Sequence, residues 1–417
     1  MSVSRREILA AGAVAGVGAF ATRASAASLG NPDEPPQGIV NTQRNPRSAV
    51  DPGPQNPALS GQFRAAFTPP ATDVGGLPEF WASFNNAPRR IQNGGWARQV
   101  TQDDFQVSTS ISGVNMRLNA GGVRELHWHQ AAEWGFMSYG NCRVTVFDPQ
   151  GRAYVADVKE GDLWNFPAGY PHSLQGLEPD GAEFILAFDN GKQTEFNTLL
   201  VTDWIAHTPP EVLAANFGVP AETFSKIFTH NLWIFQGALP GPLAADQDAV
   251  KVPNGPPPNP FTYSLAGGPV AKQTRGGKVQ IADSHNFKAA TTVAAGLVTV
   301  HPGGMREMHW HPNADEWQYY VKGSAQMTVF NTGPRAVTNN FNAGDIGYVK
   351  ANFGHYIKNI GDTDLVFLEI FKADTYQDIS LSDWLTHTPP ALVAGHFNLS
   401  PEDIAKFPQN GPVVVPV

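Results

Sequence analysis

The residues best suited to chemistry form one pattern that occurs twice in the chain. In each copy two histidines stand one residue apart, a glutamate follows shortly after, and a third histidine comes after a later Gly-Asp turn. The two copies are His127, His129, Glu133, His172 and His309, His311, Glu316, His355. Imidazole nitrogen and carboxylate oxygen without thiolate suit manganese, iron, nickel or copper better than structural zinc. The pattern therefore predicts two metal sites, each with open positions for substrate and for water or dioxygen.

The spacing within each copy indicates how four side chains could meet. Residues two apart in a strand point to the same face, so His127 and His129 are expected to face one interior. Glu133 follows a turn, and His172 arrives on another strand after the turn at 167–169. A single His-x-His pair is weak evidence, because such pairs are often incidental. Two complete sets with flanking glycines are much harder to obtain by chance.

The distance between the copies indicates that a whole domain is repeated. A step of 182 residues leads from His127 to His309, and a step of 183 leads from His172 to His355. Because this period is too long for a solenoid, we expect two related domains. Their predicted extents are 61–238 for the first and 261–417 for the second, with a Pro/Gly-rich linker at 239–260.

Local sequence predicts mainly strands within each domain. Four short runs are rich in β-branched and aromatic residues, at 143–148, 184–189, 325–331 and 365–371. The chain also holds 41 glycines and 35 prolines, which suits many short strands joined by turns. We therefore expect an all-β fold with one jelly-roll barrel per domain. Short helical segments are expected to close each domain, and Pro210 is placed to start one of them.

The N-terminus has the composition of an export signal. A pair of arginines, Arg5 and Arg6, precedes a short apolar stretch, and Ala24-Ser25-Ala26 supplies a cleavage motif. Residues 1–26 are therefore predicted to be a signal of the twin-arginine type, and the protein to be periplasmic or secreted. The stretch is too short and too glycine-rich to span a bilayer well. Residues 27–60 are expected to form an extended arm.

The net charge argues against one class of binding partner, and the cysteine count excludes an intrachain disulfide. The net charge is −9, and no basic run or stripe occurs, which argues against nucleic-acid binding. A small anionic substrate would therefore need positive charge at its own site. Cys142 is the only cysteine, so no intrachain disulfide can form.

These motifs resemble the two motifs of the cupin superfamily. The pattern G-x5-H-x-H-x3,4-E-x6-G fits residues 121–140 and 303–323, and its downstream partner fits 161–172 and 344–355. The second domain departs from that partner pattern at Lys350 and Asn352, where Pro and Gly are usual, and the first departs at Gly176. More narrowly, the chain is similar to the bicupin oxalate decarboxylases. That resemblance implies two tandem cupin barrels, two manganese ions per chain, dioxygen as a cofactor, oxalate as substrate, and a trimer or hexamer.

The narrower resemblance also implies roles for residues outside the ligand sets. Arg124 and Arg306 stand three residues before the first ligand of each domain, where a guanidinium could clamp a substrate carboxylate. Three is an odd step for one face of a strand, so a bend at the preceding glycine pair is expected to turn the arginine inward. Residues 194–198 correspond to a mobile lid, with Glu195 as proton donor. Glu369 lies in an apolar strand and should face the metal cavity or a partner.

The two sites are not expected to be equivalent, since Leu186 stands where the second domain has Glu369. We expect the first site to be the main catalytic centre and the second to be structural or an auxiliary redox site. The favoured function is oxalate decarboxylation, and oxalate oxidation to hydrogen peroxide is the alternative. A storage or ligand-binding bicupin is disfavoured because such proteins typically lose their ligands. An isomerase or dioxygenase acting on a larger substrate stays open on the ligands alone.

Overall fold

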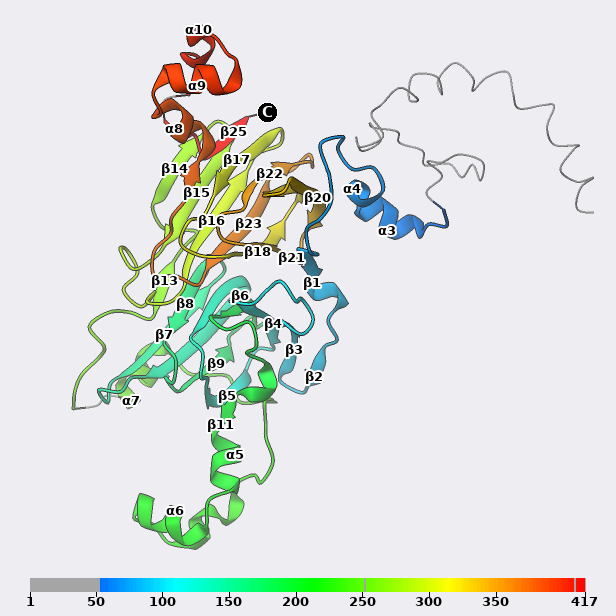
Figure 1. Cartoon of the computed structure of the whole chain (residues 1–417). Helices are drawn as coiled ribbons and strands as arrows, with labels where there is room; N and C mark the ends of the chain where they lie inside the picture. Colours follow the sequence, from blue (N-terminus) through cyan, green and yellow to red (C-terminus); the bar gives the residue numbers. More distant parts are fainter. Residues whose placement is uncertain (1–52, 251–252, 409, 417) are drawn as a thin grey trace, which may run out of the picture. The chain divides into compact units, whose positions relative to one another are not determined.

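The computed structural model describes residues 53–250, 253–408 and 410–416 (Figure 1). The predicted signal at 1–26 and most of the predicted arm lie outside these residues. The chain divides into two compact units. The smaller unit holds 53–77 of the described residues together with 330–340, and the larger holds the rest.

In the smaller unit two short helices, α3 (Pro57–Gln62) and α4 (Arg64–Phe67), follow each other directly. Asn56 caps α3, because its side-chain oxygen accepts the otherwise unpaired amide of Ala58 over 3.1 Å. Asp73 accepts hydrogen bonds from both the amide and the hydroxyl of Thr338, each over 2.8 Å. These contacts tie the segment 53–77 to the segment 330–340.

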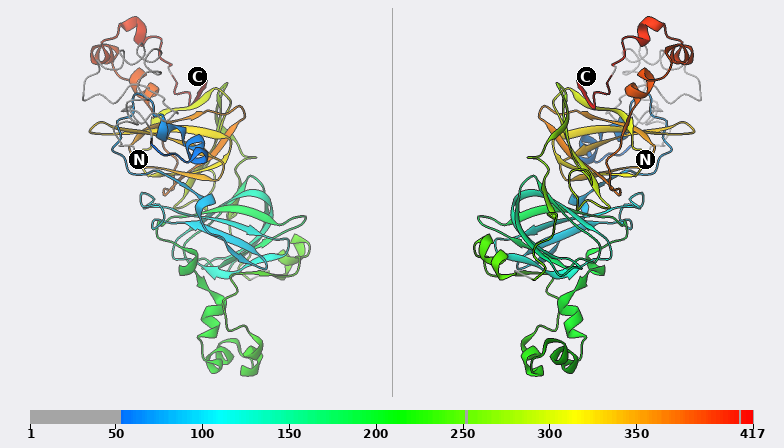
Figure 2. Two further views of the ribbon diagram at one scale, coloured as in Figure 1. Left: turned by 90° about the vertical axis from the view of Figure 1, so that its right-hand side faces the viewer. Right: turned by 90° about the vertical axis from the view of Figure 1, so that its left-hand side faces the viewer.

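The larger unit contains two β-barrels, shown in cyan to green and in yellow to orange in Figure 1 and again in Figure 2. Their central strands pair antiparallel. The first barrel consists of β2 (Arg90–Gln92), β3 (Gly95–Val100), β4 (Ser112–Leu118), β5 (Gly122–Trp128), β6 (Glu133–Phe147), β7 (Ala153–Lys159), β8 (Asp162–Phe166), β9 (His172–Gly176), β10 (Ala182–Phe188), β11 (Leu199–Leu200) and β12 (Ile234–Gln236). Its main strand order is β11-β5-β9-β6-β10-β4-β3-β2. The long strand β6 pairs with β10 and β8 in its first half and with β7 and β9 in its second, which closes the barrel.

The second barrel repeats this arrangement. It consists of β14 (Val270–Thr274), β15 (Gly277–Ala282), β16 (Ala294–Val300), β17 (Gly304–Trp310), β18 (Glu316–Lys322), β19 (Ser324–Asn331), β21 (Asp345–Val349), β22 (Gly354–Asn359), β23 (Leu365–Phe371), β24 (Ile379–Ser380) and β25 (Val414–Pro416). Strand β20 (Arg335–Asn342) belongs mostly to the smaller unit. The order β21-β18-β23-β16-β15-β14 forms one face, and β19-β22-β17-β24 lies in the other. The predicted all-β fold with two tandem barrels is therefore confirmed.

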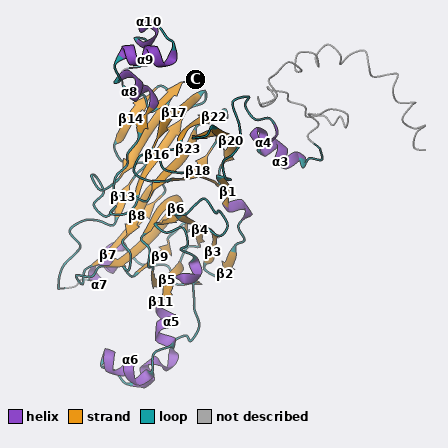
Figure 3. Cartoon of the chain, viewed as in Figure 1, coloured by secondary structure: helices purple, strands orange, loops and turns teal. Residues whose placement is uncertain are grey.

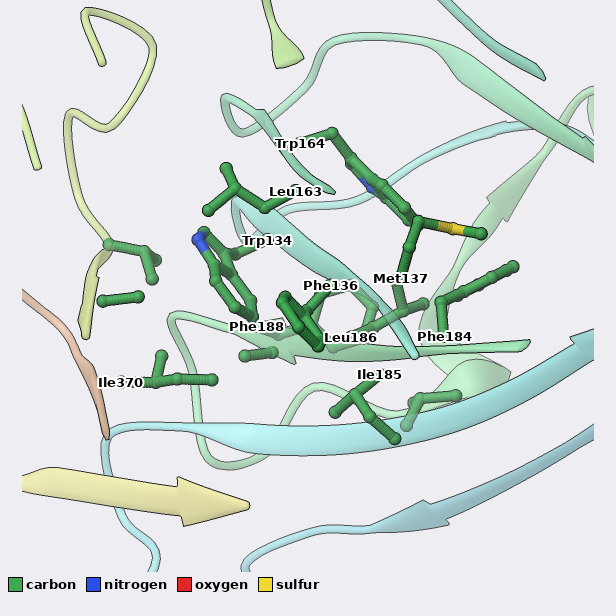
Figure 4. Close-up of a cluster of buried hydrophobic side chains, with 14 of the residues drawn as sticks. Trp134, Phe136, Met137, Leu163, Trp164, Phe184, Ile185, Leu186, Phe188 and Ile370 are labelled. Carbon is green, nitrogen blue, oxygen red and sulfur yellow. The ribbon is translucent and has the colours of Figure 1, made fainter. Parts of the chain in front are cut away.

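Each barrel receives a short strand from the chain that leads into the other barrel. Strand β1 (Trp81–Ser83) precedes the first barrel but pairs with β21 of the second. Strand β13 (Thr262–Ser264) precedes the second barrel but pairs with β8 of the first. The two barrels also share one buried apolar cluster, in which Ile370 of β23 lies with Trp134 of β6 (Figure 4). Burial of such side chains stabilises the fold by about 2–3 kcal/mol each, so the barrels support one another.

Short helices follow each barrel, as predicted (Figure 3). They are α5 (Val201–Ala206), α6 (Pro210–Phe217) and the 3-10 helix η3 (Ala221–Lys226) after the first barrel, and α8 (Leu381–Thr386), α9 (Pro390–Phe397) and α10 (Pro401–Ile404) after the second. Pro210 stands at the start of α6, and Gly218 ends it with a left-handed backbone, φ 66°. The predicted linker also contains a helix, α7 (Leu243–Ala249). Within the described part of the chain, no helix is both long and apolar enough to cross a membrane.

Candidate metal centres and active site

The first predicted ligand set comes together inside the first barrel. His127 lies on β5 with His129 just beyond its end, Glu133 begins β6, and His172 begins β9. One coordinating atom from each lies within 4.8 Å of the others, and all four residues are buried. The second set, His309, His311, Glu316 and His355, converges in the same way in the second barrel.

Backbone carbonyls fix the orientation of two of the three imidazoles in the first set. The Nδ1 atoms of His127 and His172 lie 2.6 and 2.7 Å from the carbonyl oxygens of Glu125 and Tyr170. A carbonyl oxygen only accepts, so each Nδ1 carries the proton and each Nε2 presents a lone pair to the centre. The Nε2 atoms of His129 and His172 lie 3.1 and 3.2 Å from Oε2 of Glu133.

The second set leaves its coordinating atoms without hydrogen-bond partners. Among the described residues, no well-aligned hydrogen bond reaches Nε2 of His309, His311 and His355 or Oε2 of Glu316, and all four atoms are buried. Nε2 of His311 and of His355 lie 3.2 and 2.8 Å from Oε2 of Glu316, so these atoms contact only one another. A buried polar atom without a partner costs about 1–3 kcal/mol. One cation would satisfy all four atoms together, so the residues of this site fit a metal ion.

The protonation states also suit metal binding. Burial lowers the pKa of His129 to about 4 and holds the pKa of His127 well below its usual range, so both imidazoles are neutral. Burial alone would raise the pKa of Glu133, but His172 and His129 hold it well below its usual range. Neutral imidazole and ionised carboxylate are the forms that bind metals. Nitrogen and oxygen donors without sulfur fit manganese or iron.

A β-bulge, and not the predicted bend at the glycines, turns the arginines inward. Arg124 pairs with Leu174 and His127 pairs with His172, so three steps along β5 match two along β9. The second barrel has the same register shift between Arg306 and His309. The extra residue restores the inward face, because a bulge places two residues opposite one. Arg124 and Arg306 are accordingly 2% and 0% exposed.

The two arginines differ in what they bind. Arg306 donates to Glu369 over 3.1 Å, to Asp378 over 2.8 Å and to Tyr376 over 3.1 Å. Burial acts to lower the pKa of Arg306, but these three groups together raise it well above its usual value.

Arg124 is much less engaged. Among the described residues, its one hydrogen bond is a 3.3 Å donation to the carbonyl of Trp233, and its guanidinium lies 5.3 Å from the centre of that indole. Burial lowers the pKa of Arg124, and the charges of Glu195, Glu133 and Glu125 offset this only in part. The guanidinium of the first site therefore has donors left for a substrate carboxylate, and that of the second does not.

Glu195 lies over the first metal site on a short structured segment. It begins the 3-10 helix η2 (Glu195–Asn197), which Thr194 and Asn197 close with reciprocal capping hydrogen bonds. Its amide donates to Oε1 of Gln99 over 2.8 Å, and its carboxylate forms an ion pair with Arg90. The Glu195 side chain is 6% exposed and lines the same pocket as Arg124 and the ligands. Thr198 of this segment also contacts Nδ1 of His129, over 3.3 Å.

Glu369 is buried in β23, as the apolar sequence around it predicted. Its Oε1 accepts from Arg306, and its Oε2 accepts from the hydroxyl of Tyr376 over 2.5 Å. Burial raises the pKa of Glu369. Its counterpart Leu186 lines the pocket of the first site, so the two cavities differ at this position.

One departure from the cupin pattern in the second domain preserves the turn. Asn352 takes the left-handed backbone, φ 68°, that Gly169 takes with φ 81° in the first domain. Asparagine is one of the few residues that adopt this conformation readily. The amides of Asn352 and Gly169 donate to the carbonyls of His311 and His129 over 3.0 and 2.8 Å.

Some residues of the sites were not predicted. Trp164 donates from its indole nitrogen to Oε1 of Glu133 over 3.0 Å, and Gln318 donates to Oε1 of Glu316 over 2.8 Å. Trp233 has a left-handed backbone, φ 54°, and packs on Arg124. The signal for Gln318 was its position two residues after a ligand, on the same face of the strand. Trp233 has no comparable signal, because it lies far from every motif.

Comparison with known proteins gives a consistent result. The chain matches the Cupin family model at residues 82–224 and 266–405. It is 51% identical over 347 residues to the oxalate decarboxylase OxdC of Bacillus subtilis, which covers 83% of this chain and 89% of that protein. It is 35% identical over 428 residues to an oxalate decarboxylase of Arthroderma benhamiae, covering 96% and 98%. A solved structure of the Bacillus subtilis oxalate decarboxylase, from work on its Mn(II) centres, matches with a TM-score of 0.86 and 47% identity. The match covers 92% of this chain and 99% of that one.

Proposed function

Because the chain belongs to the bicupin oxalate decarboxylases of the cupin family, we propose that it is a manganese-dependent enzyme that converts oxalate to formate and carbon dioxide. Dioxygen is the further cofactor of this proposal. The observation that carries it is Glu195, a buried carboxyl group on a capped segment that lines the same pocket as Arg124 and the ligands.

The residues of the first site divide the work as follows. Arg124 binds one carboxylate of oxalate through its free guanidinium donors, in the bidentate geometry that arginine favours. The bond between the two carbons breaks, one carbon leaves as carbon dioxide, and the other must gain a proton to become formate. Glu195 delivers that proton, while the closed segment around it excludes water. Overall, one oxalate dianion and one proton give one formate and one carbon dioxide.

Two manganese ions per chain are proposed, one in each ligand set. Manganese would supply one-electron redox chemistry and an anchor for a substrate carboxylate. It stands at the weak end of the affinity series for such ligands, so metal availability must decide which ion is bound. Metal analysis of protein isolated from its native compartment tests this, and a majority of zinc or copper would refute it.

The second site is proposed to be structural or an auxiliary redox site. Its guanidinium is held by two carboxylates and a tyrosine, and so has little left for substrate. In the first site, by contrast, Arg124 is free of carboxylate hydrogen bonds. Glu195 also lines the pocket of this site. Catalysis is therefore assigned to the first barrel.

Oxalate oxidase is the alternative on the same scaffold. It would convert oxalate, dioxygen and two protons to hydrogen peroxide and two carbon dioxides, and it needs no acid on the lid. The test is to incubate the manganese-loaded protein with oxalate in air and to assay formate and peroxide together. We expect formate, and we expect Glu195→Gln to lower its rate at least about 100-fold. Stoichiometric peroxide without formate would reverse the assignment.

Export and assembly complete the proposal. A protein that folds before twin-arginine export could acquire manganese in the cytoplasm and carry it out in a buried site. Fractionation of the source cells tests the proposed periplasmic or secreted location, and sequencing of the mature N-terminus tests cleavage after Ala26. A trimer or hexamer is proposed, to be measured by light scattering during size-exclusion chromatography.

A further inference from the structure

A second cavity, of about 300 Å³, lies beside the lid residue Glu195. Three arginines line it, with an amide and two carboxylates. The polar lining consists of Arg89, Arg90, Arg98, Gln99, Asp104 and Glu195. We call this space the arginine cavity. Its lining comes from the β2–β3 hairpin and its flanks, and from the segment that covers the first metal site.

Glu195 lies between the arginine cavity and the metal pocket. It lines both of them, with the ligands and Arg124 on one side and the three arginines on the other. The arginine cavity, at about 300 Å³, has room for a small dianion. A substrate that reaches the metal from this side must therefore move Glu195 first.

Arg90 connects the two spaces. It forms the ion pair with Glu195, and its guanidinium lies 4.9 Å from the centre of the Trp233 ring. Arg124 lies 5.3 Å from the centre of the same ring. The indole of Trp233 thus packs against both guanidiniums. Arg90 lines the arginine cavity, and Arg124 lines the metal pocket.

The other two arginines lie beside a second indole, and the charge of Glu183 offsets part of that of Arg98. Arg89 and Arg98 lie 5.5 and 5.3 Å from the centre of the Trp96 ring, and Arg98 donates to the side chain of Asn115. Among the residues that the structure describes, neither forms an ion pair with a carboxylate. In a chain with a net charge of −9, such a local positive group attracts small anions.

The second barrel lacks this arrangement. Arg90 pairs with Ala97 in the β2–β3 hairpin, and Lys272 pairs with Val279 at the same place in the β14–β15 hairpin. By the same register the counterpart of Arg98 is Gln280, whose amide donates to backbone carbonyls. Arg90 and Arg98 therefore occur only in the barrel that also contains Glu195, when these two hairpins are compared.

We propose that the arginine cavity captures a small dicarboxylate dianion, and that Arg90 exchanges the Glu195 carboxylate for a carboxylate of that dianion. Resting on the proposed function, the dianion is oxalate. The exchange replaces one charge-assisted pair by another, and the second charge of the dianion favours it beside Arg89 and Arg98. Glu195 is then free to move, and the dianion passes to Arg124. Arg90 is a positioning residue in this scheme.

The test uses metal-free full-length protein, in which binding can be measured without turnover. Oxalate is titrated calorimetrically at low salt into the unmodified protein and into Arg90→Gln, Arg90→Lys and Lys272→Gln. Lys272→Gln removes one positive charge at the matching place in the second barrel. We expect Arg90→Gln to weaken binding at least 10-fold, Arg90→Lys to retain part of the affinity, and Lys272→Gln to leave it unchanged. Formate as titrant should bind more weakly than the dianion.

Equal affinity in Arg90→Gln and the unmodified protein, or equal loss in Lys272→Gln, would overturn the capture site. In the manganese-loaded enzyme we expect Arg90→Gln to raise KM for oxalate at least 10-fold, and Lys272→Gln to leave KM unchanged. The two proposals fail separately. If the loaded enzyme makes no formate while Arg90-dependent binding persists, the proposed activity is wrong and the capture site stands. If formate is made but Arg90 does not affect oxalate binding, the reverse holds.

Discussion

Trp164 donates a hydrogen bond from its indole nitrogen to Oε1 of the metal ligand Glu133 over 3.0 Å. In the second barrel Gln318 makes the matching bond to Glu316. The two donors sit on opposite members of a strand pair, since Trp164 faces Gly135 and Gln318 faces Gly347. A methyl group at Gly135 would lie 2.2 Å from the Trp164 ring, so each large side chain requires its glycine. In both barrels a side chain on a neighbouring position holds the ligand glutamate, but the donor and its facing glycine have exchanged strands.

Removing this donor should weaken the first metal site alone. In Trp164→Phe the packing is largely kept, but Oε1 of Glu133 loses its hydrogen bond. Loss of such a partner typically lowers metal affinity about 10- to 100-fold. Manganese titration followed by electron paramagnetic resonance should show one weakened site per chain. Gln318→Leu is the matched change, and it should weaken only the other site. Equal affinity at both sites in Trp164→Phe would contradict this.

A conservative change should lower catalytic activity at Arg124 but thermal stability at Arg306. Arg124→Lys replaces a planar guanidinium by a point charge, so we expect kcat/KM for oxalate to fall about 100-fold with little change in stability. Arg306→Lys disturbs the pairs with Glu369 and Asp378, so it should lower the melting temperature while formate production continues. Steady-state kinetics and thermal unfolding of both variants test these two expectations. Loss of formate production in a folded Arg306→Lys protein would show that the second site takes part in catalysis.

Features of the site encoded locally were predictable, and those set by distant strands were not. The ligands were found because their types and spacing are readable within a few residues, and because the pattern occurs twice. The inward turn of Arg124 was expected from the glycines before it, but it comes from a bulge against β9, which lies far along the chain. The pair of Arg90 with Glu195 joins residues 105 positions apart, and no local pattern marks it. For the same reason the sequence did not indicate that β1 and β13 pair with the opposite barrels.

The buried pair in the second barrel offers a test of stability. Glu369→Leu introduces the residue type that the first barrel has at Leu186, and it removes the carboxylate that accepts from Arg306 and Tyr376. Breaking one side of a buried ion pair typically costs about 3–5 kcal/mol, and Asp378 compensates only part of this. We expect denaturant unfolding to shift accordingly. Leu186→Val, a small change at the matching position, is the control and should cost about 1 kcal/mol. An unchanged unfolding midpoint in Glu369→Leu would mean that the pair contributes nothing to stability.

Metal removal should separate the two barrels. Each ligand set is buried, so bound ions stabilise the folded chain and chelation should lower the melting temperature. At an ion concentration 100 times the dissociation constant, each site contributes about 2.7 kcal/mol. His127→Ala and His309→Ala each remove one ligand, so each protein should retain one manganese per chain by elemental analysis. Only His127→Ala should lose formate production outright, because the free guanidinium of Arg124 and the carboxyl of Glu195 both belong to the first site. If His309→Ala, loaded with one ion, lost formate production to the same extent, the assignment of catalysis to the first barrel would be wrong.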